Sequence, residues 1–172
     1  IAFLGDRVVI PVRAGVFPRI YLDEVDGFEA NPEGDVITLA KRAAATYGDA
    51  AKIFASSTPL DEGTSRIWKL VTSSDVQMRY HVPCPACGHR QELLWERLRW
   101  TETPTAHDRP PLISDVHYAC AAPGCDYKIR NHEKERMLPD ARMGGTAAWV
   151  AVYDNGRRHS IGFHLSSLYS PV

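Results

Sequence analysis

The sequence predicts an α/β protein with a parallel sheet and a separate module built around four cysteines. Over residues 1–75, short apolar runs alternate with amphipathic helical stretches, which is the rhythm of helices layered on a parallel sheet. From residue 76 onward, apolar and polar residues alternate in short strands that flank two close cysteine pairs. These two patterns divide the chain into segments of different architecture.

The composition is that of an ordinary globular protein. The 172 residues are 44% hydrophobic and 24% charged, which suffices for one domain with a core or for one and a half smaller domains. The net charge of −1 gives no overall field toward nucleic acid or an anionic membrane, so any DNA contact would be local. No apolar run approaches the ~20 residues that a membrane span needs. Because the chain starts at Ile1 without a signal peptide, we expect a piece of a longer protein.

The first expected strands are short and apolar. Residues 7–12 read as a strand that carries Pro11 at an edge position. Residues 19–22 form an apolar run without alternation, typical of a strand buried on both faces of a parallel sheet. Asp23 and Glu24 follow directly, at the carboxyl end of this strand, where α/β sheets place their ligands.

Two helices and one more strand complete this part. Residues 34–47 have helical apolar spacing, and Gly48 suits the C-terminal end of that helix. Residues 51–55 read as the next strand. Asp61 or Thr64 is expected to cap the helix that follows.

The second half of the chain reads mainly as hairpins. One hairpin is expected around the first cysteine pair and a second over residues 117–129. We expect Trp95 and Trp100 in the core of this module, and the Pro- and Thr-rich residues 101–111 in an exposed loop. Residues 161–169 are expected to form a strand that returns to the sheet of the first part.

The four cysteines predict a structural zinc site. Cys84 and Cys87 form a C-x-x-C pair, and Cys120 and Cys125 form a wider C-x-x-x-x-C pair. Four thiolates at tetrahedral corners make a closed zinc site, which leaves no open position for a reacting water. The metal is therefore expected to hold the module together and not to be a reaction centre.

Alternatives to zinc remain open at this point. Gly88 favours a metal-binding turn, because a positive φ there lets backbone N–H groups face the sulfurs. Disulfides, unrelated buried thiols and a redox C-x-x-C are the alternative interpretations. His89 or His117 could also replace a thiolate as a ligand.

Asp23 and Glu24 match the Walker B pattern, an apolar run that ends in Asp-Glu. In that pattern the Asp holds the Mg²⁺ that bridges the phosphates, and the Glu polarises the attacking water. Ser57 and Thr58 stand in a hydroxyl-rich loop after the next strand, where helicase-like and packaging ATPases have a loop that couples hydrolysis to movement. The alternatives are a solvated strand end and an ordinary turn. Arg66 is either a nucleotide-sensing arginine or, as we favour, a helix-surface arginine.

The order and spacing of several blocks resemble the GpA-type large terminase subunit of tailed phages, over nearly the whole chain. In chain order these blocks are 21–26 (YLDEVD), 34–35 (GD), 57–59 (STP), 63–67 (GTSRI), 80–89 (YHVPCPACGH), 93–100, 162–165 (GFHL) and 168–171 (LYSP). The resemblance is weakest over residues 1–18 and 101–116.

The resemblance implies a RecA-like P-loop ATPase of a viral DNA-packaging motor, with a nuclease elsewhere in the full-length parent. Residues 1–75 would be the second half of the ATPase core, with its α/β parallel sheet. Residues 76–130 would be an inserted zinc ribbon with four cysteine ligands, and residues 131–172 a segment that returns to the ATPase sheet. Asp23 would be the Mg²⁺ carboxylate and Glu24 the catalytic carboxylate.

Further implications concern ligands and partners. Ser57 and Thr58 would form the coupling loop, at an ATP site shared with Asp23. The implied partners are double-stranded DNA, the small terminase subunit, the portal protein and further copies of the subunit in a homo-oligomeric motor. The implied location is the host cytoplasm, with no membrane contact.

The chain departs from the family pattern in three places. No G-x-x-x-x-G-K-[ST] occurs, so the phosphate cradle is missing and we expect the chain alone to be inactive as an ATPase. The second cysteine pair is wider than the usual C-x-x-C, and Val172 stands where the family tends to have Trp. Two other functions remain: a zinc-ribbon DNA- or protein-binding module without ATPase activity, and a helicase-type ATPase.

Overall fold

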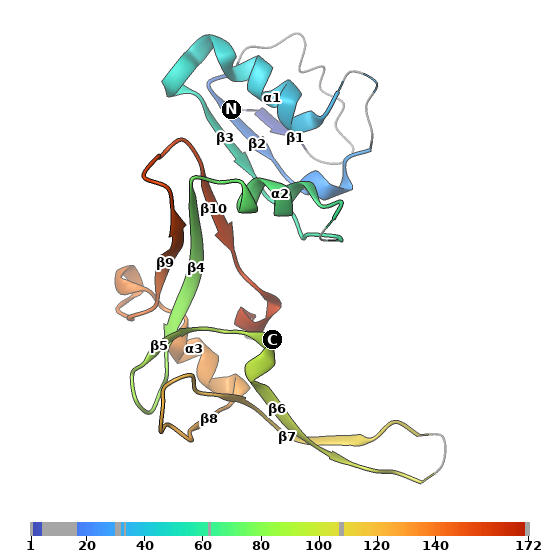
Figure 1. Ribbon diagram of the computed structural model, residues 1–172, viewed down its shortest axis with the longest axis vertical. Helices are drawn as coiled ribbons and strands as arrows, with labels where there is room; N and C mark the ends of the chain where they lie inside the picture. The colour runs from blue at the N-terminus through green and yellow to red at the C-terminus, as the bar shows by residue number, and fades with distance from the viewer. Residues whose placement is uncertain are drawn as a thin grey trace. The chain divides into compact units, whose positions relative to one another are not determined.

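The computed structural model of the protein describes residues 2–4, 17–29, 32, 34–61, 63–106 and 109–170. The chain divides into two compact units, Ile1–Ser73 and Ser74–Val172, each with a core of its own (Figure 1). The strand expected at residues 7–12 lies outside the described residues. Within the described part of the chain, no helix is long and apolar enough to span a bilayer.

A parallel sheet of three strands forms the first unit, as the sequence predicted. In order of pairing, its strands are β1 (Ala2–Leu4), β2 (Arg19–Leu22) and β3 (Lys52–Ala55). Ile20 and Leu22 of the central strand are buried in the core of this unit. Because β2 and β3 are parallel and Leu22 lies opposite Ala55, the chain leaves both strands at the same edge of the sheet.

Helix α1 (Val36–Ala44) lies over one face of this sheet (Figure 1). The Asp35 carboxylate accepts hydrogen bonds from two backbone N–H groups of its first turn, at 3.0 and 3.3 Å, and so caps the helix. Ile37, Ala40 and Ala44 form the buried face of the helix, and they belong to the same core cluster as β2.

Helix α1 is followed by a 3-10 helix from Ala45, and the helical backbone breaks at Gly48, which has φ 49° and ψ −128°. The predicted cap of the second helix is wrong. Helix α2 (Arg66–Thr72) is capped by Ser65, whose Oγ accepts the N–H of the third helical residue at 3.0 Å. The Asp61 carbonyl accepts the backbone N–H groups of Thr64 and Ser65, and Gly63 and Thr64 form a turn, so the helix begins later than expected.

The central sheet of the second unit is built on one long strand. Its strands are β4 (Val76–Pro83), β5 (Arg90–Glu92), β9 (Ala148–Asp154) and β10 (Ile161–His164). All three partners pair with β4: β5 and β9 antiparallel, and β10 parallel. The expected hairpin around the first cysteine pair is present as β4 and β5.

The expectation that residues 161–169 return to the sheet of the first unit is wrong, because β10 pairs with β4. Asp75, directly before β4, explains this arrangement. Its carboxylate accepts the backbone N–H groups of His159 and Ser160 at 3.1 and 3.2 Å and the Asn155 side-chain amide at 2.9 Å. These bonds fix the turn that precedes β10 against the start of β4.

A third sheet is antiparallel and consists of β6 (Leu98–Thr103), β7 (Leu112–Ala119) and β8 (Lys128–Ile129). The pairing of β7 with β8 is the second expected hairpin. The exposed loop predicted over residues 101–111 is shorter than expected, because β6 and β7 pair as far as Thr103 and Leu112. Figure 1 shows these two strands as a long arm at one end of the unit.

The placement of Trp95 and Trp100 in the core is also wrong. Their exposed fractions are 63% and 44%, and the Trp100 indole N–H donates to the Glu102 carboxylate at 2.7 Å. Trp95 lies in the 3-10 helix before β6, and Trp100 lies in β6, where every residue after Leu98 is exposed. The core is formed instead by Val82, Cys84, Leu93, Tyr118, Cys120, Ile129, Met137, Ala147 and Tyr169.

Short helices complete the fold. Helix α3 (Lys134–Met137) continues a 3-10 helix, and its Met137 enters the core of the second unit. The hydroxyl of Tyr169 accepts the Leu93 N–H at 2.8 Å and donates to the Tyr80 carbonyl, which joins the end of the chain to the central sheet. Among the described residues, the 3-10 helices are Val25–Gly27, Ala45–Ala50, Trp95–Arg97, Asn131–Glu133, Ala141–Met143 and Ser167–Tyr169.

Candidate functional site

Two groups of side chains have the geometry of functional sites, and the first is the acidic end of β2. Asp23 and Glu24 leave the sheet beside Ser56 and Ser57, which follow β3. The Ser56 N–H donates to the Leu22 carbonyl at 2.9 Å, so the pairing of the two strands continues into these segments. Both acids are exposed, at the carboxyl edge of the parallel sheet.

Each acid has one serine hydroxyl beside it. Ser56 Oγ donates to Asp23 Oδ1 at 2.6 Å, and Ser57 Oγ lies 3.3 Å from Glu24 Oε2. The sequence singled out Ser57 and Thr58 but missed Ser56, and the Thr58 side chain is exposed. Its position could have indicated Ser56 from the sequence, because Ser56 is the first residue after β3 and Asp23 is the first residue after β2. In a parallel pair these two residues lie opposite each other.

Glu24 has the left-handed backbone conformation, with φ 53° and ψ 49°. This conformation costs a residue with a Cβ atom about 1–2 kcal/mol, and such residues gather at active sites. The backbone of Glu24 is therefore determined by the surrounding contacts and not by its own preference.

This conformation gives a test on the stability of the first unit. Glu24→Gly is expected to be more stable than Glu24→Ala by about 1 kcal/mol, because glycine adopts a positive φ without a Cβ clash. Denaturant unfolding of the two variants measures the difference. Asp23→Gly and Asp23→Ala are the matched pair, because φ is not positive at Asp23. There the alanine variant should be the more stable one. If glycine were the more stable residue at both positions, the assigned backbone would be contradicted.

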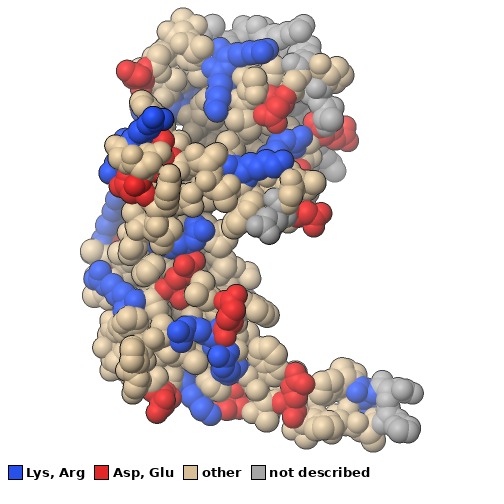
Figure 2. All heavy atoms as spheres, in the orientation of Figure 1, with Lys and Arg blue, Asp and Glu red and all other residues tan. Residues whose placement is uncertain are grey.

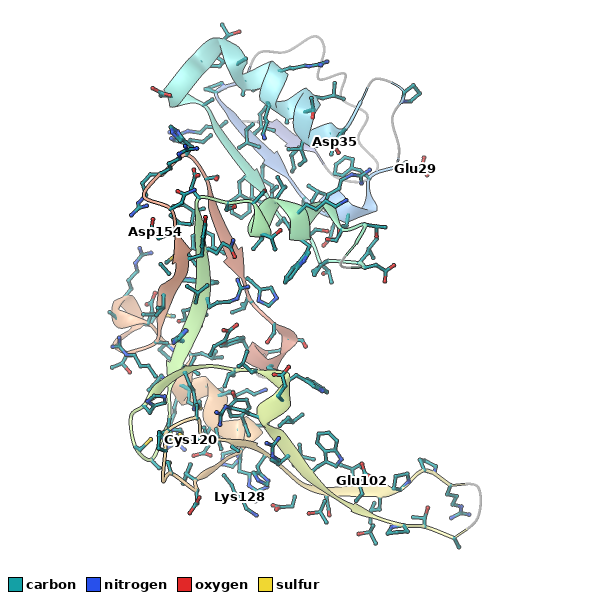
Figure 3. The ribbon with its side chains drawn as sticks, in the orientation of Figure 1. Glu29, Asp35, Glu102, Cys120, Lys128 and Asp154 are labelled. Atoms are coloured by element: carbon teal, nitrogen blue, oxygen red, sulfur yellow. The ribbon has the colours of Figure 1, made fainter. Side chains whose placement is uncertain are left out.

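Arg66, for which the sequence allowed a nucleotide-sensing role or a place on the helix surface, is half-buried and bonded within the first unit. Its guanidinium Nη1 donates to the carbonyls of Val25 and Phe28 at 3.0 and 2.7 Å, and its Nε pairs with Asp35 at 3.2 Å. Figure 3 labels Asp35, which also caps α1. Arg66 therefore ties the segment after Glu24 to the starts of both helices of the unit.

The second group is the cluster of the four cysteines. Their Sγ atoms all lie within 4.8 Å of one another, and those of Cys87 and Cys120 are 3.7 Å apart. A tetrahedron with Zn–S bonds of ~2.3 Å has sulfur–sulfur edges of about 3.8 Å. The cluster thus has the size of a four-thiolate metal site, and among the described residues all four cysteines are free of disulfides.

Tight turns present these sulfurs. Gly88 has φ 72°, as predicted, and its N–H donates to the Cys84 carbonyl at 2.9 Å. Gly124 has φ 73° in the second turn, where the Ala122 N–H points at Cys120 Sγ at 3.4 Å. Backbone N–H groups directed at sulfur stabilise thiolates, so both turns suit metal-bound cysteines.

The thiols differ in their tendency to ionise. Burial raises the pKa of Cys120 to about 12, whereas a backbone hydrogen bond from His89 lowers the pKa of the exposed Cys87. A buried thiol with such a high pKa stays protonated at neutral pH unless a cation lies beside it, and a coordinating thiol loses its proton to the metal. A metal ion at this site would displace the Cys120 proton, and the spacing of the four sulfurs is the observation that fits a metal ion.

Asp115 neutralises the basic side chains beside the second cysteine pair. Its carboxylate pairs with Lys128 Nζ at 2.7 Å and Arg130 Nη2 at 2.6 Å, and these bonds lower the pKa of Asp115 to about 2. The ring Nδ1 of His117 lies 2.6 Å from the Asp115 carbonyl oxygen. Acidic and basic side chains are interspersed on the face shown in Figure 2, so charge of one sign does not gather there.

Comparisons with known proteins show which family the chain belongs to. The sequence profile of the family described as "Phage terminase large subunit gpA, ATPase domain" matches residues 4–149. The large terminase subunit of Escherichia phage lambda is 31% identical over 137 residues, which cover 70% of this chain and 20% of that protein. The chain thus matches about a fifth of the length of this relative, and no solved structure matches it. The chain belongs to the family of the phage terminase large subunit gpA ATPase domain.

Proposed function

We propose that this chain is the second half of the ATPase core, with its metal module, of a large terminase subunit that packages viral DNA. The observation that carries the proposal is the convergence of Asp23 and Glu24 with Ser56 and Ser57 at the carboxyl edge of the parallel sheet. In this proposal residues 1–75 belong to a RecA-like P-loop fold and residues 76–130 form a zinc ribbon. Residues 131–172 complete the ribbon unit, since their strands pair with β4.

The Asp23–Glu24 pair has the chemistry of a Walker B site. Asp23 offers exposed carboxylate oxygens to Mg²⁺, and Ser56 orients one of them through its 2.6 Å hydrogen bond. When bound, Mg²⁺ neutralises the charge that develops on the phosphates of ATP. Glu24 would accept a proton from the attacking water, and Ser57 beside it would form the coupling loop with Thr58.

Zinc is the proposed metal of the cysteine cluster. Four thiolates from Cys84, Cys87, Cys120 and Cys125 close a tetrahedral site without a position for water, so zinc would supply folding energy and no catalysis. The cluster joins the β4–β5 hairpin to the β7–β8 hairpin, which are far apart in sequence. The proposed role of the metal is to hold these two hairpins together.

The partners follow from the family alone. We propose double-stranded DNA, the small terminase subunit, the portal protein and further copies of the subunit as partners of the full-length parent, with a nuclease in that parent and the host cytoplasm as its location. A binding module without ATPase activity is the second candidate function, and a helicase-type ATPase the third. The exposed side chains of Trp95 and Trp100 favour the binding module.

The proposal is tested by comparing the chain with its parent. The purified 172-residue chain is expected not to hydrolyse ATP, because no G-x-x-x-x-G-K-[ST] segment is present to hold the phosphates. The complete subunit should hydrolyse ATP with Mg²⁺. A phosphate-release assay on both proteins measures this. Glu24-dependent hydrolysis by the chain alone would contradict the assigned boundaries, and an inactive complete subunit would favour the binding module.

A further inference from the structure

Asp26 is the third acid after β2, and its carboxylate is used differently from those of Asp23 and Glu24. Oδ1 accepts the backbone N–H of Ile67 in the first turn of α2 at 2.8 Å, and Oδ2 accepts the backbone N–H of Leu60 at 3.1 Å. Burial by itself would raise the pKa of Asp26, but hydrogen bonds from Ser65, Ile67 and Leu60 outweigh it and lower the pKa. Asp26 therefore stays charged and is held by backbone donors on two segments.

The backbone of Asp26 reaches the acidic site itself. Its N–H donates to Ser57 Oγ at 3.2 Å. That hydroxyl has a single proton and two acceptors, Glu24 Oε2 at 3.3 Å and the Thr58 carbonyl at 3.2 Å. The Asp26 N–H thus fixes the oxygen of Ser57, while its proton can turn toward Glu24 or away from it.

The segment around Asp26 is bonded to α2. Arg66, the first residue of α2, donates to the carbonyls of Val25 and Phe28, which flank Asp26 on both sides. Together with the bond from Ile67 to Asp26, three hydrogen bonds join the two segments. A displacement of the loop after Glu24 would therefore be shared by the start of the helix.

We propose that Asp26 is a positioning residue of the ATPase site, which holds the Ser57 hydroxyl against Glu24 and joins this loop to α2. This inference rests on the proposed ATPase function. Asp26 does not touch the reacting atoms: it acts through Ser57. The contact with Ser57 is made by the Asp26 backbone N–H, and the two carboxylate oxygens fix the position of that N–H. One oxygen accepts the N–H of Leu60, three residues after Ser57, and the other accepts the N–H of Ile67 in α2.

A double-mutant cycle in the complete subunit tests the proposal. Asp26→Asn keeps the size of the side chain but turns one acceptor into a donor, so Leu60 and Ile67 cannot both be bonded. Asp26→Asn and Ser57→Ala are each expected to lower kcat about tenfold while the KM for ATP changes less than about twofold. The kcat of the double variant should be close to that of the single variants, because both substitutions disrupt the same hydrogen-bonded group of residues. If a variant were only partly folded, its kcat per bound nucleotide would equal that of the wild type. Normalising kcat to the nucleotide bound therefore separates a folding defect from a change at the site.

Asp140→Asn is the matched control. Asp140 also accepts two backbone N–H groups, those of Arg142 and Met143, but it lies in the second unit. Its substitution should leave kcat unchanged. Additive effects of Asp26→Asn and Ser57→Ala, or a normal kcat in Asp26→Asn, would overturn the proposal. Normal hydrolysis in Glu24→Gln would instead overturn the proposed function, because the acids would then not be the site.

A measurement without variants covers the case in which Asp26→Asn does not fold. In NMR spectra of the 172-residue chain, the amide signals of Leu60 and Ile67 should titrate together, with one midpoint below the usual Asp pKa of 3.8. Both amides donate to the same carboxylate, so they must report the same protonation. Separate midpoints, or no titration of Leu60, would overturn the link that Asp26 makes.

Discussion

Cys120→Ser is expected to unfold the second unit and to leave the first unit folded. A structural zinc site in a small module contributes on the order of 10 kcal/mol to folding, and a whole domain is stable by only about 5–15 kcal/mol. Cys120 is buried and its sulfur lies 3.7 Å from that of Cys87, so a hydroxyl there removes one of four ligands from the centre of the unit. The first unit has a core of its own, formed by β2 and α1.

Three measurements check this result. Elemental analysis should find one zinc per wild-type chain and well under one in the variant. Near-ultraviolet circular dichroism should lose the tryptophan signal of the second unit, and thermal unfolding should retain the transition of the first. His89→Ala is the matched control, since the exposed His89 side chain lies next to the first cysteine turn but outside the sulfur cluster. Wild-type chain without zinc, or with intact disulfides, would contradict the assignment.

Glu24→Gln in the complete subunit is expected to keep ATP binding and to lose hydrolysis by about 10²–10⁴-fold. The amide has the size of the carboxylate and can still accept a hydrogen bond from Ser57, but it does not take a proton from water. The exposed Glu24 side chain lies beside Ser57, with Oε2 3.3 Å from Ser57 Oγ, where a water could reach it.

Glu29→Gln provides the control for charge. Glu29 is exposed and follows Glu24 by five positions, and Figure 3 labels it in the same unit. Its substitution removes the same charge but should leave turnover unchanged. ATP binding is measured by nucleotide titration and hydrolysis by phosphate release. Near-normal turnover in Glu24→Gln would mean that Asp23 and Glu24 are a solvated strand end.

Local pattern was sufficient for much of this fold. The apolar run at 19–22 predicted a strand of a parallel sheet, and the two cysteine pairs predicted the turns that bring four sulfurs together. The positive φ of Gly88 followed from its place after Cys87. These features depend on neighbours along the chain, because the strand period, turn chemistry and cysteine spacing are local properties.

Contacts between segments that are distant in the chain could not be predicted from the sequence. Trp95 lies in the 3-10 helix before β6 and Trp100 lies in β6, and an aromatic side chain does not reveal whether another layer covers it. The partner of β10 depends on Asp75, which lies more than eighty positions earlier and holds the turn before it. Both errors arose because side-chain burial and strand pairing depend on residues far apart in the chain.

The same distinction holds at the acidic site. The order of residues along the chain was enough to predict the family resemblance, the acidic pair after β2 and the four cysteines as one donor set, since each can be read from residue types and their spacing. The folded chain was needed to see that Ser56 faces Asp23, that Arg66 ties down the loop after Glu24 and that Asp26 is bonded to α2. Those bonds join residues separated by more than thirty positions, and their geometry exists only once β2 and β3 have paired and α2 has packed beside them.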